Sequence, residues 1–232
     1  MIKPICSAAE ALAQVRDGST IMLGGFGSPG TPFTLIEALL DQGARELTVI
    51  KNDANETGLG LGRLLQAGRV RKLIASHIGL NRDAVALMNE GQLEVEFVPQ
   101  GILAERIRCG GVGLPGIISD VAQDLSPPSS GQPIEFNGRR CTLETALRAD
   151  LALIHAQTAD RFGNLRYHAT AINFNPLMAM AAKHVIAECM QVQSEDTLAP
   201  DDVHSAGIFV DALVAANAND AAYALMEHHI HV

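Results

Sequence analysis

The sequence predicts an α/β fold with an open, largely parallel sheet flanked by helices. Short apolar segments alternate with segments of helical spacing through the first half of the chain, and glycine or proline separates most of them. Strands that alternate with helices of this length form βαβ units, in which neighbouring strands run parallel. The chain has 232 residues, of which 47% are hydrophobic. This fits a single domain over residues 1–232 with a sizeable core.

Strands and helices are expected to alternate regularly in the first half. The expected strands are Thr20–Leu23, Leu47–Ile50, Val70–Ala75 and Leu93–Val98. The expected helices are Phe33–Leu40, Arg63–Ala67, Asp83–Asn89 and Ile102–Cys109. Gly43, Gly68 and Gly91 follow the first three helices, where glycine commonly ends a helix, and Asn81 is an expected N-cap.

The second half is less regular. Asn137-Gly138 predicts a β-hairpin that joins Ile134–Phe136 to Arg139–Leu143. Asn175-Pro176 predicts a helix that begins there and runs to Lys183, because proline is favoured in the first turn. The remaining expected strands are Leu151–Ala156, Leu165–His168, Val185–Cys189 and Ile208–Leu213.

Two segments of the second half are expected to lie outside the sheet. The glycine-rich segment 110–133, which contains a Ser-Pro-Pro-Ser-Ser-Gly run at residues 126–131, predicts an exposed loop. Residues 215–232 are expected to form a C-terminal extension, and helical spacing within it predicts a helix over Ala218–His231 that packs on the outside.

The most informative segment is a glycine-rich turn between the first strand and the following helix. Residues 17–32 read Asp-Gly-Ser-Thr-Ile-Met-Leu-Gly-Gly-Phe-Gly-Ser-Pro-Gly-Thr-Pro. Glycines at a strand-to-helix turn let backbone N–H groups approach a ligand closely, at a helix end that favours anions. Thr31 is the expected N-cap and Pro32 the expected first helical residue. Ligands of parallel sheets bind beyond the carboxyl ends of the strands, so this turn is the expected binding site.

One alternative for the turn is a NAD(P)-binding oxidoreductase domain. Gly25-Phe-Gly27-Ser-Pro-Gly30 fits the dinucleotide pattern G-x-G-x-x-G, and Asp53 follows at about the expected distance of 20 residues. However, Pro29 and Pro32 delay the helix past the third glycine, whereas in that fingerprint the helix N-terminus meets the pyrophosphate.

Charge and cysteine content restrict the function classes. Seventeen basic and 26 acidic residues give a net charge of −9, which opposes binding to nucleic acid. The four cysteines are widely separated and contain no Cys-x-x-Cys pair, which indicates reduced thiols. No signal peptide and no apolar run of about 18 residues is found, so we expect a cytoplasmic protein without a membrane segment. The C-terminal histidines have no ligand partner at a metal-binding spacing, so no metal is expected.

Gln100 is the candidate catalytic residue. It lies between Pro99 and Gly101, directly after a predicted strand. A neutral amide at this position can donate a hydrogen bond to a developing oxyanion without carrying charge.

The glycine-rich segment 17–32 and a second block make the chain resemble the A (alpha) subunits of family I CoA-transferases. The second block, residues 94–111, reads Glu-Val-Glu-Phe-Val-Pro-Gln-Gly-Ile-Leu-Ala-Glu-Arg-Ile-Arg-Cys-Gly-Gly. The resemblance extends over residues 12–214. Through Val70–Gly79 the chain is most similar to the acetate/acetoacetate (3-oxoacid) type.

The resemblance implies the family's fold and a ping-pong reaction that moves CoA between a short-chain acyl-CoA or 3-oxoacyl-CoA and a carboxylic acid. In the family the nucleophile is the glutamate of a Ser-Glu-Asn-Gly motif on the B (beta) subunit, whereas this chain has no such motif. The resemblance therefore implies half of a hetero-oligomer of A2B2 type, with coenzyme A as a substrate and no other cofactor. It implies that Gln100 stabilises the oxyanion. The implied substrate- and CoA-binding residues are Gly24, Gly25, Phe26, Gly27, Gly30, Asn52 and Asp53.

The chain departs from the family pattern at three places. Residues 118–124 read Ile-Ser-Asp-Val-Ala-Gln-Asp where relatives usually carry Thr-Pro-Thr-Gly-x-Gly-Thr. Ile172 stands where many relatives have arginine, and the chain runs past the family's usual end. The first two departures are the expected positions for a change in acid choice. A CoA-transferase-like binding protein without catalytic activity stays as the second alternative.

Overall fold

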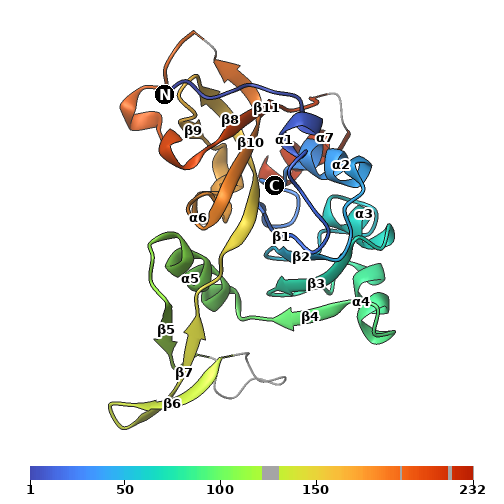
Figure 1. Ribbon diagram of the computed structural model, residues 1–232, viewed down its shortest axis with the longest axis vertical. Coiled ribbons are helices and arrows are strands. Elements are labelled where there is room, and N and C mark those ends of the chain that lie inside the picture. Colours follow the sequence, from blue (N-terminus) through green and yellow to red (C-terminus); the bar gives the residue numbers. More distant parts are fainter. Residues whose placement is uncertain (122–130, 194, 219–220, 232) are drawn as a thin grey trace.

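The computed structural model describes residues 1–121, 131–193, 195–218 and 221–231. These residues form a large, mostly parallel sheet with helices on both faces and a small antiparallel sheet that projects from it (Figure 1). The predicted fold class is therefore confirmed. None of the helices in these residues is both long enough and apolar enough to cross a membrane.

The large sheet has the strand order β11-β10-β8-β1-β2-β3-β4. The pairs along this order are all parallel, and β9 pairs with β8 in the antiparallel sense. The strands are β1 (Thr20–Leu23), β2 (Leu47–Ile50), β3 (Val70–Ala75), β4 (Glu94–Phe97), β8 (Ala149–Asp160), β9 (Leu165–Arg166), β10 (Ala182–Gln193) and β11 (Ala212–Ala215). The first-half strands match their predicted positions closely, and β8 and β10 extend beyond theirs.

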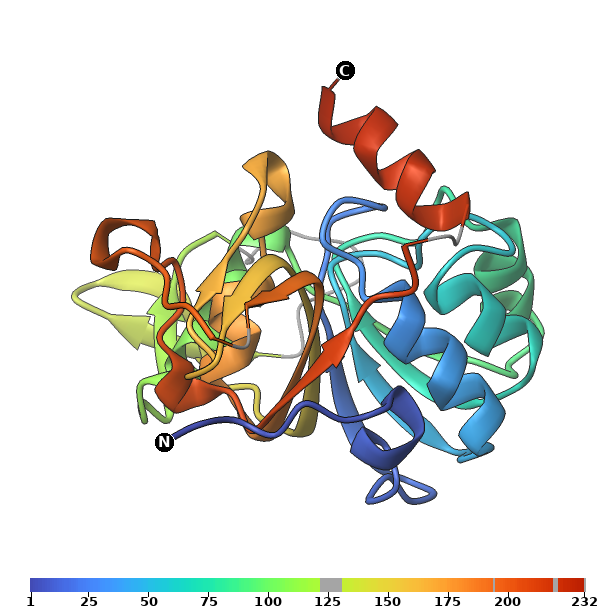
Figure 2. The same ribbon diagram turned by 90° about the horizontal axis from the view of Figure 1, so that it is seen from above.

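Helices cover both faces of this sheet because successive strand residues point to opposite sides (Figure 2). In β1, Ile21 and Leu23 pack with the helices of one face, whereas Met22 packs with those of the other. The first face carries α1 (Ala8–Ala11), α2 (Phe33–Gln42), α3 (Leu61–Gln66) and α4 (Arg82–Asn89). The second face carries α5 (Gln100–Gly111) and α6 (Asn175–Met180).

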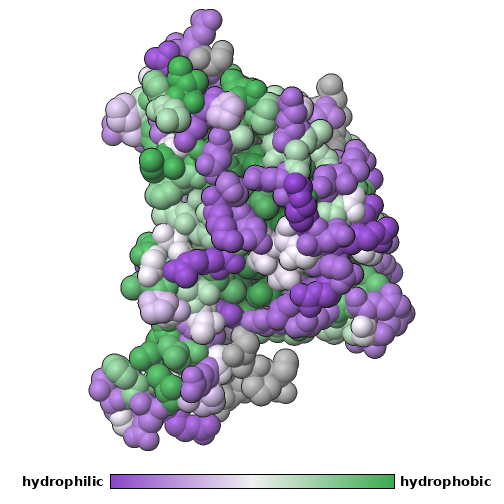
Figure 3. All heavy atoms as spheres, viewed as in Figure 1, coloured by the Kyte–Doolittle hydropathy of each residue, from purple (hydrophilic) through white to green (hydrophobic). Residues whose placement is uncertain are grey.

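The small sheet contains the predicted hairpin. β6 (Gln132–Phe136) and β7 (Arg139–Thr145) pair through Asn137-Gly138, and both turn residues have positive φ, as a two-residue hairpin turn requires. β5 (Gly116–Ser119) pairs with the other edge of β7. Figure 3 shows hydrophobic residues on the projecting sheet, where Ile118 is 44% exposed and Phe136 is 50% exposed. Residues 122–130 of the predicted loop lie outside the described residues.

Four local predictions are wrong. The loop expected over 110–133 contains β5, because residues 116–119 pair with β7, and β6 begins within it at Gln132. The predicted N-cap Thr31 does not cap α2, because its hydroxyl donates to the Gly27 carbonyl at 2.7 Å and Pro32 takes the cap position. α6 ends at Met180 rather than Lys183, because Ala182 already pairs with β8 as the first residue of β10. The strand expected from Ile208 begins only at Ala212.

The remaining elements of the described residues are short turns and the last helix. Three single turns of 3₁₀-helix are η1 (Ala169–Ile172), η2 (Pro200–Asp202) and η3 (Gly207–Phe209). α7 (Ala221–His231) is the last element and packs its buried Tyr223 and Met226 against Phe33 of α2. It occupies most of the segment for which helical spacing is expected.

Candidate functional site at the glycine-rich loop

The glycine-rich loop starts at the carboxyl end of β1, which lies between β8 and β2 in the sheet. The loops that follow β2, β3 and β4 lie at the same edge, because these neighbouring strands are parallel. The fold therefore brings Asn52, Ser76 and Gln100 to the edge at which the glycine loop stands.

The path of the loop requires glycine at its first two positions. A Cβ on Gly24 would lie 1.9 Å from the Asn175 Oδ1 atom. Gly25 has a φ of +102°, and a Cβ there would lie 2.4 Å from the Thr31 Oγ1 atom. Asn175 is fully buried, and its amide donates to the carbonyls of Gly30 at 3.1 Å and Ala171 at 2.9 Å. One asparagine from the second half of the chain thus holds both ends of the loop.

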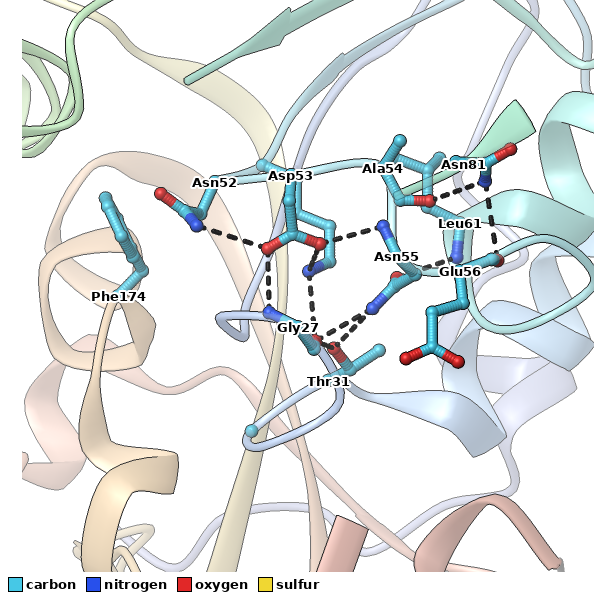
Figure 4. A network of polar contacts seen from close by, with 12 residues as sticks. Gly27, Thr31, Asn52, Asp53, Ala54, Asn55, Glu56, Leu61, Asn81 and Phe174 are labelled. Carbon is cyan, nitrogen blue, oxygen red and sulfur yellow. Dashed lines mark hydrogen bonds and ion pairs between the residues drawn. The ribbon is translucent and has the colours of Figure 1, made fainter. Parts of the chain in front are cut away.

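Asp53 holds the middle of the loop through a network of hydrogen bonds (Figure 4). Its Oδ2 accepts the Gly27 N–H at 2.7 Å and the Asn52 amide at 3.2 Å, and its Oδ1 accepts the Lys51 Nζ at 3.3 Å and the Asn55 N–H at 2.8 Å. Asp53 is 3% exposed and Lys51 is completely buried. Burial by itself would raise the pKa of Asp53, but the Lys51 charge and these hydrogen bonds outweigh it and hold that pKa below its usual range. Burial lowers the pKa of Lys51.

Gln100 joins the same network from the fourth strand. It is the first residue of α5, and its Nε2 donates to the Asn52 Oδ1 at 3.1 Å. The Ser76 hydroxyl donates to the same oxygen at 3.0 Å and lies 2.9 Å from the His77 Nδ1. An amide nitrogen carries two hydrogens, so this bond leaves one Gln100 N–H that can donate to another acceptor. The exposed side chain of Gln100 is thus oriented by the buried Asn52.

The site residues expected from the sequence fall into two groups. Four of them are joined by hydrogen bonds, and the other four are the loop residues Gly24, Gly25, Phe26 and Gly30. Gln100, Asn52, Asp53 and Gly27 form one continuous hydrogen-bonded chain. The side chains of Asn52 and Asp53 in this hydrogen-bonded series face the interior rather than the solvent. A side chain that contacts a ligand directly has to be accessible from the solvent. Phe26 is 45% exposed at the tip of the loop, and its ring centre lies 6.5 Å from that of His77.

A pocket of about 640 Å³ opens beside the loop. It is lined by Phe26, Gly27, Ser28, Pro29, Glu56, Leu80, Thr170, Asn173 and His229. Of the expected binding residues, only Phe26 and Gly27 line it. Gly24, Gly25 and Gly30 instead allow the close packing that shapes the loop.

Sequence reasoning missed the residues that support the loop. Asn55 has a positive φ of 53°, and its amide donates to the Gly27 carbonyl at 2.8 Å while its Oδ1 accepts the Leu61 N–H at 3.0 Å. Four of the five residues at 51–55 are polar, and this polar run directly after an apolar strand was the signal that could have revealed them. Such a run at the carboxyl end of a buried strand is typical of a site.

A second buried polar cluster, also missed, lies behind the loop. The His155 Nδ1 is 2.8 Å from the Glu188 Oε1, and both side chains are buried. Glu188 also accepts the Leu35 N–H at 3.0 Å in the first turn of α2, where a carboxylate is favoured, and the Tyr223 hydroxyl at 2.6 Å. Partners more than 30 residues apart leave no local signal in a sequence.

The geometry of the loop does not suit a dinucleotide. The Gly27 N–H, which a pyrophosphate would need, already donates to Asp53, and α2 begins only at Phe33. Within the part of the chain that the structure describes, no group of three or more His, Cys, Asp and Glu side chains could hold a metal ion.

Comparison with known proteins identifies the family. The family model described as Coenzyme A transferase matches residues 5–216. The chain is 50% identical over 209 residues to the alpha subunit of a probable coenzyme A transferase of Bacillus subtilis (strain 168), covering 90% of this chain and 91% of that one. It is 44% identical over 207 residues to the alpha subunit of the acetate CoA-transferase of Escherichia coli (strain K12), covering 89% and 94%.

A solved structure shows the same fold. The acyl-CoA transferase YdiF from Escherichia coli O157:H7, in its thioester complex with CoA, superposes with a TM-score of 0.84 at 24% identity. The match covers 94% of this chain and 48% of that one. The chain belongs to the coenzyme A transferase family. Its similarity to alpha subunits makes it the alpha-type chain of a transferase and does not favour the two alternatives, a NAD(P)-binding domain and an inactive binding protein.

Proposed function

We propose that this chain, together with a beta subunit, transfers CoA between a short-chain acyl-CoA or 3-oxoacyl-CoA and a carboxylic acid. Coenzyme A is then a substrate rather than a resident cofactor. Nearly full-length similarity to alpha subunits, one of them named for acetate, supports this activity. The names imply a second type of chain, and an A2B2 assembly is the arrangement we propose.

The reaction that we propose proceeds in two half-reactions. A glutamate on the beta subunit uses its carboxylate to attack the thioester carbonyl, which forms an acyl-glutamyl anhydride and releases CoA thiolate. The thiolate attacks the glutamyl carbonyl of the anhydride, which forms a glutamyl-CoA thioester and releases the first acid. A second acid reverses these steps and leaves as its CoA ester. Covalent catalysis of this kind replaces one difficult exchange by easier steps.

Gln100 is the residue of this chain that we assign to the chemistry. Each attack creates a negatively charged oxygen, and a preorganised amide donor stabilises it without adding a charge. The observation that carries the assignment is the 3.1 Å hydrogen bond from the Gln100 Nε2 to the buried Asn52, which fixes the amide and leaves one N–H to donate. Phe26 and Gly27 would contact the substrate, whereas Asn52 and Asp53 would position the loop and Gln100.

The projecting sheet is the surface that we propose for contact with the beta subunit. Ile118 of β5 and Phe136 of β6 are large apolar side chains that are about half exposed there. Contiguous exposed apolar patches mark interaction sites, whereas apolar side chains scattered singly do not. The four cysteines form no disulfide, which supports a reducing compartment, and we propose that the enzyme works in the cytoplasm.

The proposed function is tested by co-purifying this chain with its beta subunit, followed by an assay of exchange between acetoacetyl-CoA and acetate. We expect activity in the complex, none in either chain alone, and a glutamyl-CoA thioester on the beta subunit when acyl-CoA is supplied without acceptor. Mass spectrometry of that chain detects the intermediate. An active complex that never forms it would exclude the ping-pong reaction, and a complex inactive with every short-chain acid would exclude the transferase.

A further inference from the structure

The C-terminal helix α7 is the feature that the proposed function leaves without a role. It lies outside residues 5–216, the part of the chain that the family model matches. In Figure 2, α7 (red) lies alongside the loop that follows β1, and it contacts the η1 turn on the other side of the pocket. A helix outside the part of the chain that the family model matches thus reaches the candidate site.

Buried contacts fix the position of α7. The Tyr223 hydroxyl donates to the Glu188 Oε1 at 2.6 Å and accepts the Thr34 N–H at 3.0 Å, and the residue is 3% exposed. Its ring meets the edge of Phe33 with centres 5.6 Å apart and stacks on His155 with centres 5.7 Å apart. A tyrosine held on both its ring and its hydroxyl anchors the helix to the core of the fold.

Further along the helix from this anchor, α7 contributes His229 to the pocket beside the glycine loop. Phe26, Pro29 and Leu80 give the pocket apolar surface. Its one charged carboxylate is that of Glu56, which in Figure 4 points away from the hydrogen-bonded network, and none of the described lining residues is Lys or Arg. Such a lining suits an uncharged apolar chain and disfavours a second carboxylate, because like charges repel.

We propose that α7 is a wall of this pocket and that His229 is a specificity-determining residue, which limits the acid to a short monocarboxylic chain. This inference rests on the proposed transferase function. The exposed imidazole of His229 lines the space that a longer acyl chain would need, and the Tyr223 anchor holds the helix that carries it. Discrimination by pocket size is worth about 10- to 200-fold for each methylene.

The test compares acids of different length with the assembled complex of the two types of chain. In His229→Ala, kcat/KM for hexanoate relative to acetate should rise by about tenfold. His228→Ala is the matched control, because His228 lies on the same helix and is exposed like His229 but does not line the pocket. An unchanged ratio in His229→Ala would overturn the proposal.

Two further variants test the wall and its charge separately. Tyr223→Phe removes the hydroxyl from Glu188 but keeps the ring, so it should shift the ratio in the same direction while circular dichroism stays unchanged. Glu56→Gln should raise kcat/KM for succinate relative to acetate, and a constant ratio there would contradict the monocarboxylic preference. If the unmutated complex transfers CoA to no acid, the proposed function has failed. If it is active but His229→Ala leaves its profile unchanged, only this inference has failed.

Discussion

At the scale of single residues, one buried amide side chain, that of Asn52, connects the residues of the candidate site. Asn52 is completely buried and connects Gln100 to Asp53, and Asp53 in turn holds the Gly27 N–H. The exposed donor and the glycine loop are therefore positioned by the same two side chains. This arrangement separates the residue that we assign to the chemistry from the residues that orient it, and the two kinds respond differently to mutation.

Gln100→Ala should lower kcat by about 100-fold, because one oxyanion donor is lost. KM and assembly with the beta subunit should change little, since Gln100 is exposed. Steady-state kinetics and size-exclusion chromatography measure the two effects. Gln92→Ala, at another exposed glutamine, is the control and should keep full activity. Unchanged kcat in Gln100→Ala would remove this residue from the mechanism.

Asp53→Asn should destabilise the fold by about 3 kcal/mol, because it leaves the buried ammonium of Lys51 without its counter-charge. Asp150→Asn breaks an ion pair with Lys183 that is largely exposed and should cost at most about 1 kcal/mol. Urea unfolding followed by circular dichroism compares the two variants. Equal losses would show that the Lys51–Asp53 pair contributes no more than a surface pair.

Asp53 also predicts a dependence of stability on pH. Its pKa lies below the usual range in the folded chain, so the folded state binds a proton less readily than the unfolded state. The stabilisation is complete above about pH 4, the usual pKa of aspartate, and is lost as the pH falls through the lower folded pKa. Urea unfolding at several acidic pH values should show this decline. Asp53→Asn should have a shallower decline, and parallel curves would contradict the assignment.

At the scale of elements, the glycine loop and α6 depend on each other. Asn175 begins α6, and its side chain occupies the space left by the missing Cβ of Gly24. The loop therefore keeps its path only while α6 stays in place.

Gly24→Ala should destabilise the fold by about 1–3 kcal/mol, because the new methyl group overlaps the Asn175 amide. Activity should fall as well, since the loop that forms the pocket is displaced. Gly79→Ala is the control, because a Cβ there meets nothing within 4 Å. Thermal unfolding and kcat/KM for acetate are the measurements. Equal behaviour of the two variants would show that the loop does not need its close contact with Asn175.

At the scale of the whole molecule, the chain presents its site at one edge and its exposed apolar sheet at one end (Figures 1 and 3). Phe136→Glu on that sheet should weaken the complex with the beta subunit by at least about tenfold, or about 1.4 kcal/mol. Ile208→Glu is the control, because Ile208 is 82% exposed but lies outside the projecting sheet. Titration with the labelled partner chain gives the two dissociation constants. A complex as tight as the unmutated one in Phe136→Glu would place the interface elsewhere.

The regular first half of the molecule could be predicted from the sequence because its signals are local. Apolar runs of strand length, glycines after helices and the Asn137-Gly138 turn each depend on neighbouring residues only. The errors at helix ends arose where another hydrogen-bond partner competes with the local helix preference. Thr31 bonds back to Gly27 instead of capping α2, and Ala182 joins β8 instead of extending α6.

The sequence by itself determined the order of strands and helices, the glycine loop after the first strand and the position of Gln100 at a strand end. The tertiary structure decided which of these features meet. β8 lies directly beside β1 although about 130 residues separate them in the chain, and Asn175 reaches Gly24 across this junction. β10 in turn lies beside β8, and this pairing places Glu188 opposite His155. Only the structure places His229 of α7 in the pocket with Phe26. Local spacing encodes periodicity and turns, whereas contacts between distant segments depend on the order of strands in the sheet, which no local pattern records.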